Sequence, residues 1–269
     1  MLTVPVLTYH SQNITGRDYS ENDHVALARD LLTINRSGMR VIPLEHLITW
    51  LNGELPESAV LNAVCITFDD GCDFDYCDMD FPGQGPQRSL LGIMQDFAQD
   101  AGAGVQPGLH ATSFVIASRE ARQTIDKKSL FGRNWISDHW WPAADQHPLM
   151  SIENHGWDHN HPDLAGENRG NFHSVDSHAD CLEQVVRAGS AIESVTGRWP
   201  AIFAYPFGES SDYLRDTFFP DYTDVHGCEA AFGTHPGPVS RGSNRWDLPR
   251  YVCGRDWRSP GALEGILQT

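Results

Sequence analysis

Short apolar runs alternate with amphipathic segments along most of the chain. The apolar runs are rich in β-branched and aromatic residues and predict strands at residues 4–10, 39–42, 63–68, 111–116, 201–205, 230–232 and 251–253, with a further strand signal just before residue 152. Apolar positions at helical spacing predict helices at residues 22–38, 44–51, 89–101, 175–196 and 260–267. This alternation of strands and helices predicts a mainly parallel sheet, open or closed into a barrel.

The strand predicted at residues 63–68 ends abruptly in two carboxylates, Asp69 and Asp70, followed by Gly71. In α/β folds the loops at the carboxyl ends of the strands gather around a ligand, so both acids are expected at the mouth of a site. A plain Asp-Asp-Gly turn with solvated acids is the alternative interpretation.

Three histidines within seven residues, His155, His159 and His161, form the second unusual stretch. His155 and His159 have a spacing that can point two imidazoles at one metal ion. With one of the two aspartates they would form an Asp-His-His site that leaves coordination positions open. A metal there would polarise a carbonyl group and lower the pKa of a bound water, while the other aspartate takes the proton. The pattern therefore favours hydrolysis of an amide or ester.

An acidic loop and a tryptophan cluster are weaker signals. Residues 72–80 lack the spacing of a calcium-binding EF-hand loop and are predicted to be a solvated loop that could rim a substrate site. Trp135, Trp140 and Trp141 are either core residues or a flat platform for sugar rings. We retain Trp140 and Trp141 as candidate substrate-binding residues.

The charge balance is strongly acidic, with 19 Lys and Arg against 36 Asp and Glu and a formal net charge of -17. Such a field repels phosphates, so no nucleic-acid partner is expected. No apolar run is long enough to span a membrane, and no secretory signal is visible, which favours the cytoplasm unless a signal was removed before residue 1. We expect a single domain over residues 1–269. The oligomeric state and the pairing of the six cysteines stay open.

Two motifs resemble those of a known family. Residues 67–71 (Thr-Phe-Asp-Asp-Gly) are similar to the first motif of the polysaccharide deacetylases of the NodB-homology type, carbohydrate esterase family 4, and residues 155–159, leading into 162–164, to the second. Residues 5–10 and 38–47 are similar to the start of many members, and residues 204–208 fall where the third motif belongs. The resemblance implies a distorted (β/α) barrel with its site at the carboxyl face of the strands.

The resemblance also implies roles for individual residues. Asp69 would be the general base, and Asp70, His155 and His159 would bind a divalent metal, Zn²⁺ before Co²⁺, Ni²⁺ or Mn²⁺. The backbone N–H near Phe207 would help to bind the oxyanion, and Tyr205 and Pro206 beside it would contact the substrate. The reaction usual in the family removes acetyl groups from N-acetylglucosamine polymers or from O-acetylated xylan, so an acetylated carbohydrate is the expected substrate.

Two features depart from the family pattern. Ala204 stands where many members carry an arginine that orients the base, so something else must set the pKa of Asp69. The late Leu-x-His that supplies the general acid is also missing. The candidates for that acid are His10, favoured by topology, and His161, His226 and His235. His161 is in addition an alternative to His159 as metal ligand, because it directly precedes Pro162.

Three other functions stay open at this point. An Asp with two His is also the facial triad of non-haem iron oxygenases, although Asp69 would then have no role. A hydrolase of small cyclic amides or imides would use the same barrel. A carbohydrate-binding relative without turnover would account for the missing arginine and histidine.

Overall fold

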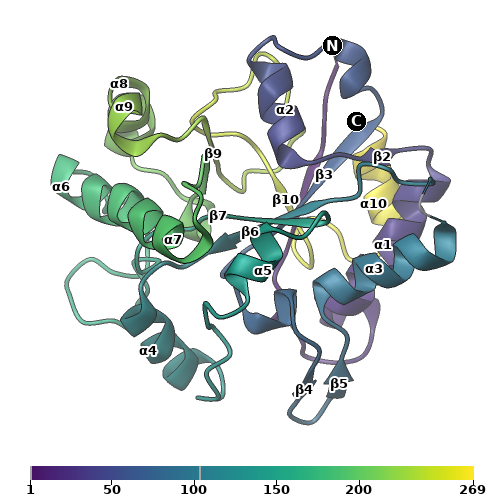
Figure 1. Cartoon of the computed structure of the whole chain (residues 1–269), viewed down its shortest axis with the longest axis horizontal. Coiled ribbons are helices and arrows are strands. Elements are labelled where there is room, and N and C mark those ends of the chain that lie inside the picture. Colours follow the sequence, from purple (N-terminus) through teal and green to yellow (C-terminus); the bar gives the residue numbers. More distant parts are fainter. Residues whose placement is uncertain (1, 103) are drawn as a thin grey trace.

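Parallel strands form one curled sheet in the computed structural model, which describes residues 2–102 and 104–269 (Figure 1). The spatial order of the strands is β10-β1-β3-β6-β7-β8-β9, and β2 pairs with the beginning of β3. The strands are β1 Val6–Tyr9, β2 Arg40–Val41, β3 Ala63–Phe68, β6 Ala111–Val115, β7 Met150–Asn154, β8 Ile202–Ala204, β9 Ala230–Phe232 and β10 Tyr251–Val252. A separate antiparallel hairpin consists of β4 Met79–Phe81 and β5 Gly85–Gln87.

The two edges of the sheet approach each other. Phe232 at the end of β9 forms a parallel bridge with Leu248, shortly before β10, and β10 pairs with β1. All residues of β1 and of β3 are buried, as expected for strands that are covered on both faces. The sheet therefore curls into the distorted (β/α) barrel that the sequence predicts.

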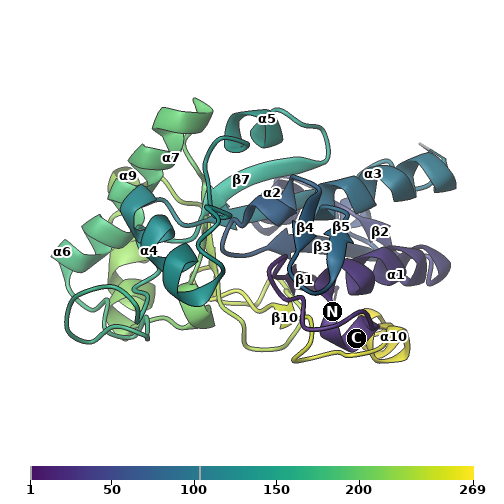
Figure 2. The same cartoon turned by 90° about the horizontal axis from the view of Figure 1, so that it is seen from below.

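Helices cover the outside of the sheet in two groups. Figures 1 and 2 show α1, α3 and α10 together on one side and α4, α6, α7 and α9 on the other. The helices are α1 Asp23–Arg36, α2 Leu44–Leu51, α3 Leu90–Ala101, α4 Arg119–Ser129, α5 Trp141–Asp145, α6 His178–Cys181, α7 Ala188–Thr196, α8 Phe219–Asp221, α9 Thr223–His226 and α10 Pro260–Leu267. A π-helical stretch, Leu182–Arg187, joins α6 to α7, and another, Leu214–Phe218, precedes α8. Within the described residues no helix has the length and apolar character needed to cross a bilayer.

The acidic loop after β3 is solvated only in its second half, so the prediction is wrong for Asp73 and Asp75. Asp73 is buried and accepts hydrogen bonds from the backbone N–H and hydroxyl of Ser137 and from Nε1 of Trp140. Asp75 is buried as well and accepts from Ser11 and Ser113. These hydroxyl and indole donors replace water, so the first half of the loop packs into the fold. Cys72 at its beginning lines the cavity described below, and Asp78 and Asp80 are exposed.

The prediction of a tryptophan platform for sugar rings is also wrong. Trp140 and Trp141 are each 1% exposed and belong to the main hydrophobic core. Trp135 is buried and packs edge-on against Phe74. The three rings therefore fill space under the connection from β6 to β7. The six cysteines are free thiols in the described structure.

Candidate active site

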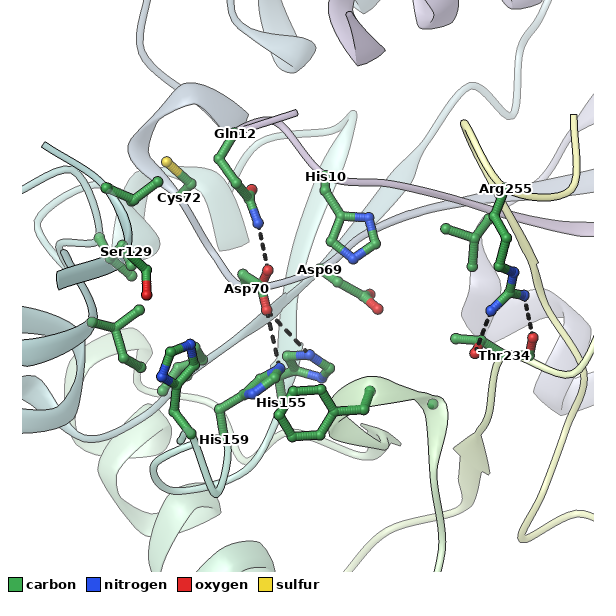
Figure 3. Close-up of a pocket in the computed structure, with 18 residues that line it drawn as sticks. His10, Gln12, Asp69, Asp70, Cys72, Ser129, His155, His159, Thr234 and Arg255 are labelled. Carbon is green, nitrogen blue, oxygen red and sulfur yellow. Dashed lines mark hydrogen bonds and ion pairs between the residues drawn. The ribbon is translucent and has the colours of Figure 1, made fainter. Parts of the chain in front are cut away.

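A cavity of about 410 Å³ opens at the carboxyl ends of the barrel strands (Figure 3). It is lined by residues that follow six of the strands and by Val252 within β10. The six are represented by His10 after β1, Asp69 and Asp70 after β3, Ile116 after β6, His155 after β7, Phe207 after β8 and Thr234 after β9. Both motifs singled out in the sequence thus face one space.

Asp70, His155 and His159 form a compact cluster in which one ligand atom of each lies within 4.8 Å of the others. Asp70 Oδ1 is 3.5 Å from His155 Nε2 and 3.3 Å from His159 Nε2. His155 Nδ1 donates to the carbonyl oxygen of Ala204 at 2.9 Å, which leaves the Nε2 lone pair facing Asp70. One carboxylate oxygen and two imidazole nitrogens suit Zn²⁺ and related divalent ions, and they leave coordination positions open.

The electrostatics of this cluster also suit a cation. Burial alone would raise the pKa of Asp70, but the adjacent imidazoles of His155 and His159 hold it well below its usual range. Burial lowers the pKa of His159, which favours the neutral imidazole that a metal needs. Gln12 Nε2 donates to the second oxygen of Asp70 at 2.5 Å and so fixes the carboxylate plane.

Three residues at the cavity have left-handed backbone conformations that residues other than glycine rarely adopt. The φ angles are 75° at Asp70, 61° at His159 and 59° at Phe207. Gly71 follows with φ 67°, and a Cβ there would lie 2.7 Å from a methyl carbon of Val115. Each such conformation costs of order 1 kcal/mol, so its concentration at one cavity indicates a functional constraint.

Asp69 is held by Arg250, which lies just before β10. Arg250 Nη1 and Nη2 donate to Asp69 Oδ1 and Oδ2 at 2.7 and 2.9 Å, and the two side chains are 0% and 4% exposed. Arg250 Nε also donates to the carbonyl oxygen of Gly233. Burial alone would raise the pKa of Asp69, but the Arg250 guanidinium holds it below its usual range. Asp69 is therefore an oriented carboxylate beside the Asp-His-His cluster.

Comparison with known proteins finds one matching family and several solved structures with a similar fold. Residues 105–218 match the sequence profile of the family described as polysaccharide deacetylase. The Streptococcus pyogenes deacetylase PplD, solved in complex with acetate, has a TM-score of 0.66 at 16% identity over 100% of this chain and 99% of its own. IcaB from Ammonifex degensii has a TM-score of 0.66 at 15% identity over 99% of this chain and 97% of its own.

The resemblance to the polysaccharide deacetylases is confirmed. The matched stretch contains His155, His159 and Phe207 but neither Asp69 nor Arg250. The structural similarity, at these identities, establishes the distorted (β/α) barrel of the NodB type, and the family match supports carbohydrate deacetylation as the class of reaction. BA0330 from Bacillus anthracis has a TM-score of 0.60 at 15% identity over 93% of this chain, which spans only 65% of that longer protein. No curated protein matches this chain by sequence.

The third motif of the polysaccharide deacetylases differs here in the way the sequence indicates. Ala204 stands where many members carry an arginine, and Arg250 reaches Asp69 from the opposite end of the sheet order. Arg250 is not among the site residues predicted from the sequence. Its one visible signal is a cation in the otherwise apolar run Leu248-Pro249-Arg250-Tyr251-Val252, where an unpaired charge is not expected to be buried.

Of the four histidines considered as general acid, two line the cavity. His10 lies beside Asp69 in Figure 3, and its Nδ1 is buried without a partner among the described residues. His161 also lines the cavity, but it lies outside the Asp-His-His cluster, and its Nδ1 accepts from the backbone N–H of Asp163. His226 is buried in the core and bonded to the Phe219 carbonyl, and His235 points to Asp247, so neither faces the cavity.

The substrate contacts expected of the third motif are only partly present. Tyr205 is buried and donates to the Trp246 carbonyl at 2.6 Å, and Pro206 is buried, so neither lines the cavity. Trp140 and Trp141 do not line it either, because both belong to the core. Phe207 does, and its ring packs edge-on against His159 with centroids 4.4 Å apart. Within the described chain, the Phe207 N–H donates to no other group.

Proposed function

We propose that this protein is a metal-dependent hydrolase that removes acetyl groups from an acetylated carbohydrate. The observation that carries the proposal is the oriented, buried Asp69 carboxylate beside the Asp70, His155 and His159 cluster in one cavity. The polysaccharide deacetylase match supports the substrate class. Neither N- nor O-linkage is favoured by the geometry.

In this proposal Asp70, His155 and His159 hold a divalent ion, with Zn²⁺ as first choice. The metal, when bound, supplies Lewis acidity toward the acyl carbonyl and the attacking water. Gln12 keeps Asp70 aimed at the two imidazoles, and the Ala204 carbonyl keeps His155 in the required tautomer. The chain thus contributes a preorganised open site.

Asp69 removes the proton of the attacking water. Both of its oxygens accept from Arg250, yet each carboxylate oxygen has a second lone pair and can still accept a water proton. The Phe207 N–H is a free donor for the developing oxyanion. His10 is the best-placed group to protonate the leaving atom, because it lines the cavity with an uncommitted buried nitrogen.

The non-catalytic alternative rested on the missing arginine and the missing late histidine. Arg250 supplies a guanidinium to Asp69, which removes the first of these reasons. An iron oxygenase would leave the Asp69–Arg250 pair without a role, and no contact in the cavity favours a cyclic amide over an acylated sugar.

Acetate release is the direct test, measured over N-acetylglucosamine oligomers, acetylated xylan and small acetylated sugars, with chelator and with added zinc or cobalt. We expect metal-dependent release from wild-type protein. Asp69→Asn should bind metal normally yet lose at least roughly a hundredfold in rate, as removal of a general base does. Unchanged rates in Asp69→Asn would contradict the assigned base, and metal binding without release from any substrate would contradict the enzyme assignment.

A further inference from the structure

The cavity has two chemically different sides. In Figure 3, Ser129 and Cys72 lie on one side of Asp70, and Thr234 and Arg255 lie on the other. The Ser129 side carries an apolar wall of four branched side chains, Ile116, Ile125, Leu130 and Ile136. The Thr234 side carries hydroxyl and guanidinium groups.

Three of the four side chains of the apolar wall are buried, and Leu130 is partly buried. Ile116, Ile125 and Ile136 are 2%, 5% and 5% exposed, and they pack together as one hydrophobic cluster. Arg255 and Phe207, in contrast, are 48% and 40% exposed, which places them at the rim. Ser129, beside the wall, is exposed as well, so a carbohydrate reaches the cavity past Arg255, Phe207 and Ser129. The part of the substrate that contacts the buried isoleucines must be apolar.

Two polar groups beside the wall already have hydrogen-bond partners. Ser129 Oγ donates to Asp163 Oδ2 at 2.5 Å, and Cys72 Sγ donates to the Trp135 carbonyl at 3.1 Å. A sugar hydroxyl buried directly against the four aliphatic side chains would have no partner there, which costs of order 1–3 kcal/mol for each group. The acyl group is the part of an acylated sugar that can occupy this side.

Building on the proposed function, we propose that this site accepts acyl groups longer than acetyl, with three or four carbons, and that the apolar wall binds their alkyl chain. Four branched side chains offer more apolar surface than the single methyl of an acetyl group can cover. Each methylene buried against them should improve binding about fourfold.

The reaction is an ordinary hydrolysis. Water adds to the acyl carbonyl carbon, the bond from that carbon to the sugar nitrogen or oxygen breaks, and the proton taken by Asp69 is balanced by one delivered to the leaving atom. The products are a short-chain carboxylate and the free amine or hydroxyl. No further reactant is needed.

The test compares butyrate with acetate release from N-butyryl- and N-acetyl-glucosamine oligomers of equal length by the zinc-loaded protein. We expect release rates within tenfold of each other. Calorimetry with the two free carboxylates gives a readout that needs no turnover, and butyrate should bind roughly 15-fold more tightly than acetate.

Variants that change the size of the wall give the decisive control. Ile125→Phe and Ile136→Phe should lower the ratio of butyrate to acetate release at least tenfold, whereas Ile136→Ala should raise release of hexanoate relative to butyrate. Gln123→Phe, on the exposed face of α4, should leave the ratio unchanged.

The acyl-chain assignment alone would be overturned by two results together. The protein would release acetate but release butyrate at less than one hundredth of that rate, and the isoleucine variants would leave the ratio of butyrate to acetate release unchanged. Absence of release from either substrate would contradict the proposed function instead. In that case calorimetry would still test whether the apolar wall binds the alkyl chain, because equal affinity for acetate and butyrate would contradict that role.

Discussion

Replacing Arg250 by methionine removes the countercharge of a buried carboxylate without leaving a large void. Both oxygens of Asp69 lose a donor at 2.7 and 2.9 Å, in a place where the two side chains are 0% and 4% exposed. Breaking a buried pair in this way costs about 3–5 kcal/mol. For a chain of this length that corresponds to a fall in Tm of roughly 6–20 °C.

The same change should impair catalysis, because Asp69 loses the guanidinium that fixes its orientation and keeps it ionised. Acetate release should fall by roughly a hundredfold or more, while zinc content stays near one equivalent. The assays are calorimetric unfolding, atomic absorption and acetate release on the same preparations.

A double-mutant cycle tests the coupling itself. Asp69→Asn with Arg250→Met leaves no buried charge, so the double variant should be more stable than Arg250→Met alone. Arg255→Met is the matched control: this exposed arginine pairs with Asp256, and its loss should cost about 0–1 kcal/mol. The reasoning is refuted if Arg250→Met unfolds within 2 °C of wild type and retains full activity.

Three further predictions concern the site and the core. His159→Ala should lose bound zinc, whereas His161→Ala should retain it, as metal analysis after dialysis would show; the reverse result would exchange the two roles. Trp140→Phe should lower the free energy of unfolding by about 1–3 kcal/mol without changing KM, because it deprives buried Asp73 of a donor at 3.0 Å. A raised KM would indicate that Trp140 contacts the substrate. Burial raises the pKa of Asp30 to about 6, above its usual value of about 3.9, so its contribution to stability is complete below pH 4 and lost as pH rises through 6. In denaturant titrations, the fall in unfolding free energy between pH 4 and 7 should therefore be roughly 3 kcal/mol smaller for Asp30→Asn than for wild type. An unchanged pH dependence would refute the raised pKa of Asp30.

The strands and most helices could be predicted because apolar residues repeat with a clear period. The helix predicted at residues 44–51 is α2, Leu44–Leu51. Helix α4 escaped prediction because its buried face includes Arg122 and Asp126 beside Ala121 and Ile125, so no apolar stripe is visible. The acidic loop was misjudged for a related reason, since the donors that allow Asp73 and Asp75 to be buried lie elsewhere in the sequence.

The candidate site was predictable where its residues are close together in the sequence. Asp69 and Asp70 are adjacent and His155 and His159 are one short loop apart, so a family motif can represent them. Arg250 lies 181 residues from Asp69 and meets it only through the pairing of β10 with β1. The apolar wall likewise combines the end of β6, helix α4 and the loop after it, and no local pattern marks these isoleucines as cavity residues.

The late position of Arg250 has a consequence for the order in which the molecule folds. A contact across 181 residues closes one of the longest loops in the chain, and such contacts form slowly. A chain emerging from the ribosome holds both aspartates and all the site histidines long before it holds the arginine. Until β10 docks against β1, the Asp69 carboxylate has no arginine partner in the interior, so the last strand must complete the barrel before Asp69 can be buried as an anion.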